Sequence, residues 1–243
     1  MSRSVSPNAG CEWYAATYGW SLLAGNVMVE GTSDVAYFQL AAKLNQVALG
    51  TSLLGKDLSI FPAGEEDDGG TFGISEKFPT LFNLAGLDLD ANGRRRFRVV
   101  ALVDDDTMGR SAVGVIAGGH RQIREFESLF RLRRVMPHRS GTAKALSVQT
   151  EALNSAFGRL ECTIEDMLSE GLCNAFAAAK PEAVSRPSTV AGPGAHRYWT
   201  IAGKRMLREF AEKTATIDDV RALVDALRAL RSYLGLPPDG VPA

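Results

Sequence analysis

The sequence lacks several features that would point directly to a function. Its three cysteines are odd in number and lack the spacing of metal ligands, so we expect core residues or free thiols rather than a disulfide framework or a zinc site. No apolar run approaches the length of a membrane span. The polar start, MSRSVSPNAG, lacks the apolar core of a signal peptide. A cytoplasmic protein without a membrane segment is therefore expected.

Strong net charge is also absent. The formal charge of −1 over 243 residues argues against a protein that coats nucleic acid, but it allows an enzyme that contacts a few phosphates. Hydrophobic and charged contents of 45% and 23% are ordinary for a globular protein. The three histidines are scattered, and we expect surface or loop positions rather than metal ligands for His120, His138 and His196.

Two apolar segments that end in acids are the most informative features present. The stretch 26–38, NVMVEGTSDVAYF, is typical of a buried strand, a tight turn and a capped helix, with Glu30 directly after the strand. The segment Phe97–Val103 is apolar apart from Arg98, and it continues into three consecutive aspartates, 104–106. Open α/β sheets bind ligands at the carboxyl ends of their strands. We therefore expect these acids to converge on one hard cation such as Mg²⁺.

Strand geometry selects among the three aspartates. Side chains alternate along a strand, so Asp104 and Asp106 should share one side and Asp105 should face the other.

Asp34 has two interpretations. Ser33 or Asp34 can cap the following helix, and Asp34 is close enough in sequence to Glu30 to take part in the same site. Both interpretations stay open at this stage.

The order of elements predicts an α/β fold. Strands alternate with helices up to about residue 140, which indicates a parallel sheet with helices on both faces. Strands are expected at 26–29, 58–61, 97–103 and 129–136, and helices at 11–23, 33–47, 75–84, 107–119 and 120–128. Pro79 is expected only in the first turn of its helix. From residue 141 the pattern is helical, at 143–160, 164–179, 198–213 and 217–234, with a flexible linker at 181–197. This divides the chain into an N-terminal tail and helix (1–25), an α/β domain (26–140) and a helical C-terminal part (141–243).

The two acidic motifs resemble a known family. Glu30-Gly31-x-x-Asp34 after one strand, with Asp104-x-Asp106 after a later one, is similar to the Toprim domain, the metal-binding module of topoisomerases, bacterial primases and several nucleases. The wording VEGTSDVAYF is most similar to the nuclease branch, the overcoming-lysogenisation-defect (OLD) type and its small stand-alone relatives. The resemblance covers about residues 26–140 and extends to Glu165 and Lys204. It implies a Rossmann-like parallel sheet with a helical C-terminal extension.

The resemblance also implies roles for individual residues. Glu30, Asp104, Asp106 and Glu165 would be ligands of Mg²⁺ or Mn²⁺, and Lys204 would neutralise charge on the reacting phosphate. Glu161 stays open as a substitute for Glu165. The assignments of Glu165 and Lys204 each have a structural alternative. Glu165 also suits the N-terminus of a helix, and Lys204 also suits a solvent-facing helical position.

The function implied is a metal-dependent nuclease that cleaves DNA or RNA, acting in defence against phage. Such proteins often work beside an ATPase sensor, and this chain lacks the phosphate-binding loop G-x-x-x-x-G-K-[ST], so a partner is expected. The alternative is a catalytically silent Toprim module that binds or regulates. At least one of two apolar helix faces, on 11–23 and on 220–230, is further expected to mediate self-association or subunit docking.

Overall fold

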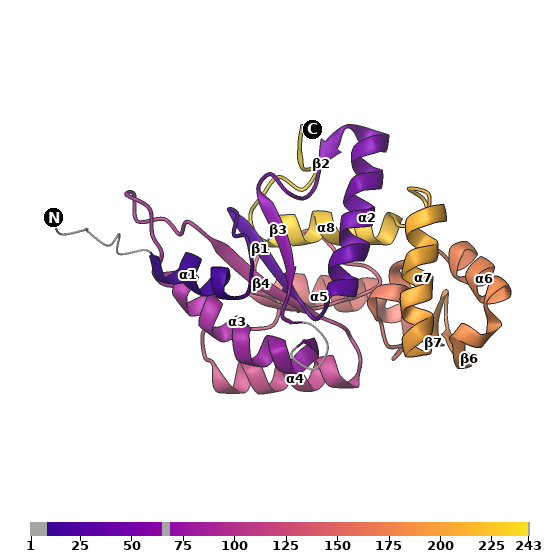
Figure 1. Cartoon of the computed structure of the whole chain (residues 1–243). Coiled ribbons are helices and arrows are strands. Elements are labelled where there is room, and N and C mark those ends of the chain that lie inside the picture. The colour runs from indigo at the N-terminus through magenta and orange to yellow at the C-terminus, as the bar shows by residue number, and fades with distance from the viewer. Residues whose placement is uncertain (1–8, 65–68, 243) are drawn as a thin grey trace.

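The computed structural model of the chain describes residues 9–64 and 69–242 (Figure 1). Its centre is a parallel sheet of four strands in the order β3-β1-β4-β5. The strands are β1 (Gly25–Val29), β3 (Leu58–Pro62), β4 (Arg98–Val103) and β5 (Leu129–Arg131). In the register, Val27 of β1 pairs with Ile60 of β3 and with Val100 of β4. The expected α/β fold with a parallel sheet flanked by helices, of the Rossmann-like kind, is confirmed.

Alternating side chains of the strands fill two separate cores. Val27, Val29 and Val100 belong to one core, under α2 (Thr32–Leu49) and α8 (Arg221–Tyr233). Met28, Val99 and Ala101 belong to the other, under α1 (Ala9–Thr17), α3 (Gly70–Leu87) and α4 (Thr107–Gly119). Figure 1 shows the two groups of helices on opposite sides of the sheet. Both faces of the sheet are therefore covered, which explains why its strands are largely apolar.

The site is positioned by the connections that follow β1 and β4. These strands are neighbours, but α2 leaves β1 toward one face of the sheet and α4 leaves β4 toward the other. Such a reversal opens a crevice at the carboxyl ends of the two strands, where α/β proteins bind ligands. Glu30 and Asp104 are the first residues after these strands.

The C-terminal part packs onto the same core as α2. Phe130 of β5 stacks on Tyr233 of α8, with ring centroids 4.4 Å apart. The elements of this part are α5 (Ala143–Asn154), η2 (Ser155–Phe157), η3 (Ile164–Met167), α6 (Glu170–Ala179), η4 (Pro181–Ala183), β6 (Val184–Ala191), β7 (Gly194–Trp199) and α7 (Ile201–Thr214), with β8 (Val241–Pro242) pairing antiparallel with β2 (Thr51–Ser52).

The linker expected at 181–197 is wrong, because β6 and β7 form an antiparallel hairpin there. Its turn contains Gly192, whose φ of 55° is easily reached only by glycine. Pro187 lies where the register of the pairing shifts, which is where a strand tolerates a residue without an amide hydrogen. The proline and glycine residues that suggested a linker therefore form the bulge and the turn of a hairpin.

Other boundaries also differ from expectation. Residues 120–128 form turns instead of a helix, and Phe126 has a φ of 65°, which an α-helix does not allow. Pro79 lies inside α3 rather than in its first turn. The helix expected over 164–179 is divided into η3 and α6, because Ser169 leaves the helix and caps α6 by accepting from the amide of Leu172.

The apolar stripe of α8, one of the two faces expected to be candidates for docking, is buried in the protein's own core and is not available to a partner: Val220, Leu223, Val224, Leu227 and Leu230. On α1, Trp13 is 69% exposed, whereas Trp20 beyond the helix is buried and stacks on Phe61.

Within the described ranges, no helix has both the length and the apolar character that crossing a membrane requires.

Candidate functional site

The carboxylate of Glu30 joins the ends of the two central strands. It follows β1 directly, and its Oε1 accepts a hydrogen bond of 2.9 Å from the backbone amide of Asp104, the first residue after β4. The next residue, Gly31, is the N-cap of α2, and its amide donates to Asp34 Oδ2 at 2.8 Å. Asp34 therefore stabilises the start of α2 from the third position of the helix, rather than as the cap itself.

The chain after β4 is held by Asp106 and Gly109. Asp106 is the N-cap of α4, and its Oδ1 accepts from the amide of Gly109 at 2.7 Å. A Cβ at position 109 would lie 1.9 Å from the carbonyl oxygen of Asp104, so only glycine fits there. This close contact fixes the path of residues 104–106 at the mouth of the crevice.

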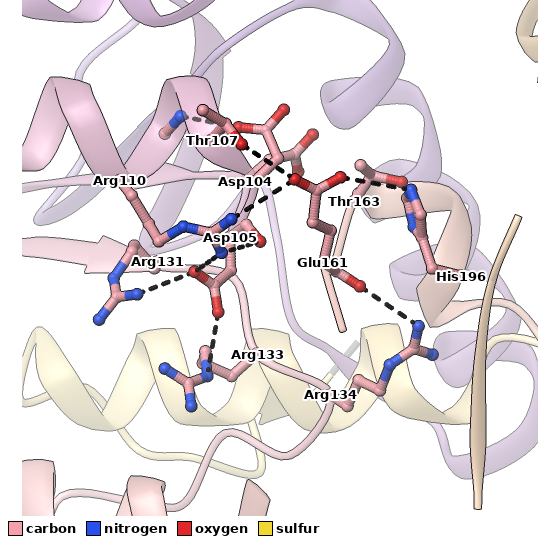
Figure 2. A network of polar contacts seen from close by, with 12 residues as sticks. Asp104, Asp105, Thr107, Arg110, Arg131, Arg133, Arg134, Glu161, Thr163 and His196 are labelled. Carbon is pink, nitrogen blue, oxygen red and sulfur yellow. Dashed lines mark hydrogen bonds and ion pairs between the residues drawn. The ribbon is translucent and has the colours of Figure 1, made fainter. Parts of the chain in front are cut away.

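Asp105 faces the opposite side from Asp104, as strand alternation predicts. Its carboxylate is contacted by the guanidinium groups of Arg110, Arg131 and Arg133, at distances of 3.2, 2.8 and 3.4 Å (Figure 2). Its backbone forms two hydrogen bonds with Cys162. That bridge brings the segment around residue 162 beside the end of β4.

Glu165 and Lys204 enter the site from the C-terminal part. Glu165 lies on η3, whose start is stabilised by reciprocal contacts between Thr163 and Asp166, a capping box. The Glu165 side chain is 3% exposed, and its Oε1 lies 3.4 Å from Lys204 Nζ in the first turn of α7. Glu165 and Lys204, two expected site residues that lie far apart in the sequence, are therefore in contact.

The charges of these residues act on one another. Burial raises the pKa of Asp104 well above its usual range, and the charges of Asp34, Glu30 and Glu165 raise it further. Burial also raises the pKa of Asp34, to about 7, with Glu30 and Glu165 adding to the shift. The pKa of Glu30 is likewise raised, first by burial and then by the charge of Asp106. A group of carboxylates in this state requires protons or a cation.

Lys204 supplies part of the missing positive charge. Burial alone would lower its pKa, but the carboxylates of Glu165 and Asp104 outweigh that effect and raise it. One ammonium group cannot balance the five carboxylates of the cluster, which are those of Glu30, Asp34, Asp104, Asp106 and Glu165. A divalent cation is the natural complement for such a set of hard oxygen donors.

Three observations bear on whether a cation fits. Glu165 Oε2 is buried and has no hydrogen-bond partner among the residues that the structure describes, and a cavity of about 10 Å³ is lined by Glu30, Asp34 and Asp104. This volume is close to the roughly 10–15 Å³ that one water needs. In the described ranges, no three His, Cys, Asp or Glu side chains are arranged closely enough to enclose an ion as they stand. The donor chemistry fits a divalent cation, and side-chain rotation would have to complete the coordination.

Glu161, the alternative to Glu165, points elsewhere. Its carboxylate accepts from Thr107 Oγ1 at 3.2 Å and lies 3.4 Å from a nitrogen of Arg110 (Figure 2). It also lies 3.7 Å from His196 Nε2. The geometry therefore places Glu165, and not Glu161, against Lys204.

Sequence reasoning missed two buried groups beside the cluster. Tyr37, one helical turn after Asp34, is 1% exposed and its hydroxyl has no hydrogen-bond partner among the described residues. His196 is 5% exposed, and its Nδ1 lies 2.6 Å from Asp166 Oδ2, so the expected surface position is wrong. Helical spacing from Asp34 could have indicated Tyr37. The environment of His196 depends on the hairpin and could not have been predicted without it.

Other charged segments lie apart from the cluster or outside the described residues. The arginine run 94–96 precedes β4, at the opposite end of that strand from Asp104, and Arg96 pairs with Glu12 and Asp88. Four acids of the loop after β3, residues 65–68, lie outside the described residues. Gly64, directly before that loop, is close to Gly69, where a Cβ would lie 2.8 Å from the Gly64 carbonyl oxygen and 3.2 Å from that of Glu30.

The fold and site together define an α/β protein with an acidic cluster at the carboxyl ends of two adjacent parallel strands. Comparison of the chain with models of protein families, with curated proteins and with solved structures gives no match.

Proposed function

We propose that this protein is a Mg²⁺-dependent nuclease of the Toprim type, which hydrolyses phosphodiester bonds. One observation carries the proposal: acids from the ends of β1 and β4, from α2 and from η3 converge with Lys204 at a switch point of the sheet. The raised pKa values of Glu30, Asp34 and Asp104 support a cation as the missing partner. The role in phage defence rests on the sequence resemblance alone.

Glu30, Asp104, Asp106 and Glu165 would hold the cation. When bound, a divalent cation would acidify a water and stabilise the charge of the leaving oxygen. Glu30 also accepts from the amide of Asp104, so one side chain orients the two strand ends relative to each other. Asp34 is fixed by the amide of Gly31 and adds negative charge beside Glu30.

Lys204 is the residue suited to contact the substrate. Its side chain is 45% exposed although its ammonium group lies against Glu165, so a phosphate oxygen can approach it from solvent. A fixed positive charge at that position would stabilise the negative charge that develops on the phosphate in the transition state.

The test is cleavage of plasmid, linear DNA and total tRNA by the purified chain with Mg²⁺ or Mn²⁺. Glu30→Gln should abolish cleavage while the fold survives, because glutamine keeps the oxygen that accepts from Asp104. Asp90→Asn is the matched control: residues 88–90 are a second Asp-x-Asp sequence, and this variant removes its last acid, which lies at an exposed turn. Metal-independent cleavage, or full activity of Glu30→Gln, would contradict the proposal.

A second candidate is a catalytically silent binding module. It is favoured by the absence, within the described ranges, of three side chains already arranged around an ion. Titration with Mg²⁺ and Mn²⁺ separates the two functions, because a silent module would show neither saturable binding at these acids nor cleavage of any of the three substrates.

A further inference from the structure

A pocket rich in arginine lies on the other side of residues 104–106 from the acidic cluster. It has a volume of about 370 Å³. Five arginines and two acids line it: Arg110, Arg131, Arg133, Arg134, Arg159, Asp105 and Glu151. Figure 2 shows the guanidinium groups of Arg110, Arg131 and Arg133 gathered around Asp105. The lining therefore carries a formal charge of +3 in a protein whose net charge is −1.

The sequence places these arginines by strand alternation. In the stretch 129–134, LFRLRR, the apolar residues enter the cores, and Arg131 and Arg133 both turn toward Asp105. The side chains of Arg131, Arg133 and Arg134 are only 18, 14 and 12% exposed. These guanidinium groups are partly removed from water, so a nearby anion stabilises their charge more than it would at an exposed position.

The acids present do not satisfy all of these groups. Asp105 is shared among three guanidinium groups. Glu151 holds Arg133 through two hydrogen bonds, of 2.9 and 3.2 Å, in the paired geometry that a phosphate also adopts with arginine. Arg159 is exposed and has no carboxylate within ion-pair distance among the described residues. Within the described part of the chain, the pocket therefore offers one arginine without an acidic partner, Arg159, and one that a rim carboxylate occupies, Arg133.

The arginine pocket and the acidic cluster lie on either side of the same short segment of the chain. Asp105 lies between Asp104 and Asp106, so the two sites occupy opposite sides of the same three residues. Arg110, from the pocket, also approaches Glu161, which contacts Thr107, the residue after Asp106. A strand that crosses residues 104–107 would present one phosphate to the acids and a neighbouring phosphate to the arginines.

We propose that the arginine pocket binds a phosphate group of the nucleic-acid strand, next to the phosphate held at the acidic cluster. This inference rests on the proposed nuclease function and assigns how that enzyme holds its substrate. Guanidinium groups suit the task, because their planar forks bind phosphate oxygens in pairs and they stay charged at every physiological pH. The contact would position the strand without reading its sequence.

The test is binding of a fluorescent single-stranded oligonucleotide in EDTA, followed by anisotropy over a series of salt concentrations. Arg159→Gln removes no internal contact and should weaken binding roughly threefold to tenfold, with a salt slope smaller by about 0.7. Arg133→Lys should also weaken binding, because it keeps the charge but loses the fork. Arg221→Gln, at an exposed arginine of α8, is the matched control and should bind as the wild type does.

Glu151→Gln should increase the affinity for the oligonucleotide, a result that misfolding would not produce. It removes the carboxylate that occupies Arg133, at a side chain 56% exposed, and should tighten binding severalfold. The inference is overturned if Arg159→Gln and Arg133→Lys bind as the wild type does, or if Glu151→Gln binds no tighter. It is also overturned if inorganic phosphate or a nucleoside monophosphate saturates the pocket while the oligonucleotide does not compete.

The same variants separate this inference from the proposed function. Because binding is measured without divalent ions, the expected changes together with absent cleavage in Mg²⁺ and Mn²⁺ would contradict the nuclease and retain the phosphate pocket. Metal-dependent cleavage that Glu30→Gln abolishes, with oligonucleotide affinity unaffected by the arginine variants, would retain the nuclease and overturn the pocket.

Discussion

Without divalent ions, Asp34 should make the protein less stable as the pH rises. Its folded-state pKa of about 7 lies above the ordinary value of 3.8, so the folded state binds the proton more tightly than the unfolded state. The resulting stabilisation is fully present below about pH 4 and is lost as the pH rises through about 7. A difference of about 3 between the two pKa values corresponds to roughly 4 kcal/mol in the free energy of unfolding, of which somewhat more than half falls between pH 5 and pH 8.

The substitution Asp34→Asn isolates this effect. Asparagine keeps an oxygen that can accept from the amide of Gly31, so the start of α2 is preserved, but it carries no charge to be neutralised. Between about pH 5 and pH 8 in EDTA, we expect the free energy of unfolding of the variant to fall by roughly 2–3 kcal/mol less than that of the wild type. The measurement is urea unfolding followed by circular dichroism, with Asp90→Asn as the control for an exposed acid. Mg²⁺ should reduce the pH dependence of the wild type, because it stabilises the ionised cluster.

The reasoning fails if the wild type and Asp34→Asn depend on pH to the same extent. It also fails if Asp90→Asn flattens the profile as much as Asp34→Asn does, because the effect would then not come from the buried cluster.

Three further predictions follow from individual contacts. Gly109→Ala should cost about 1–3 kcal/mol in the free energy of unfolding and abolish cleavage, because its Cβ would collide with the Asp104 carbonyl oxygen. Gly114→Ala in the same helix is the control, since its Cβ would lie more than 4 Å from the other described atoms considered, and it should be neutral or stabilising. Lys204→Ala should lower cleavage strongly and lower the melting temperature in EDTA, since Glu165 loses its partner, and Lys204→Arg should restore little activity. Asp57→Asn should cost about 3 kcal/mol in urea unfolding, because the fully buried Arg231 loses the charge that it contacts through two hydrogen bonds of 2.7 Å; an unchanged midpoint would contradict this.

The sequence was most informative where one local rule was sufficient. Apolar runs that end in acids located β1 and β4, and side-chain alternation correctly predicted that Asp105 faces away from Asp104. These features depend on residues within a few positions of one another, so no tertiary information was needed.

The features that sequence reasoning missed depend on contacts between distant residues, or on proline and glycine residues that are compatible with more than one structure. The sequence predicts a linker at 181–197 where the structure has a hairpin, because proline and glycine form turns in linkers and in hairpins alike. His196 is buried only because that hairpin brings it against Asp166. The arginine pocket assembles groups from α4, β5 and the segment around Arg159, and no spacing in the sequence reveals that they meet.

The measurement that most directly tests the central claim is calorimetric titration of the purified chain with Mn²⁺ and Mg²⁺, in the absence of nucleic acid. The wild type should bind the cation saturably, and the double variant Glu30→Gln with Asp104→Asn should lose that binding while staying folded. Asp105→Asn, whose side chain contacts arginines on the other side, should bind as the wild type does. Equal binding by the wild type and the double variant, or loss of binding in Asp105→Asn alone, would contradict the proposed cation site.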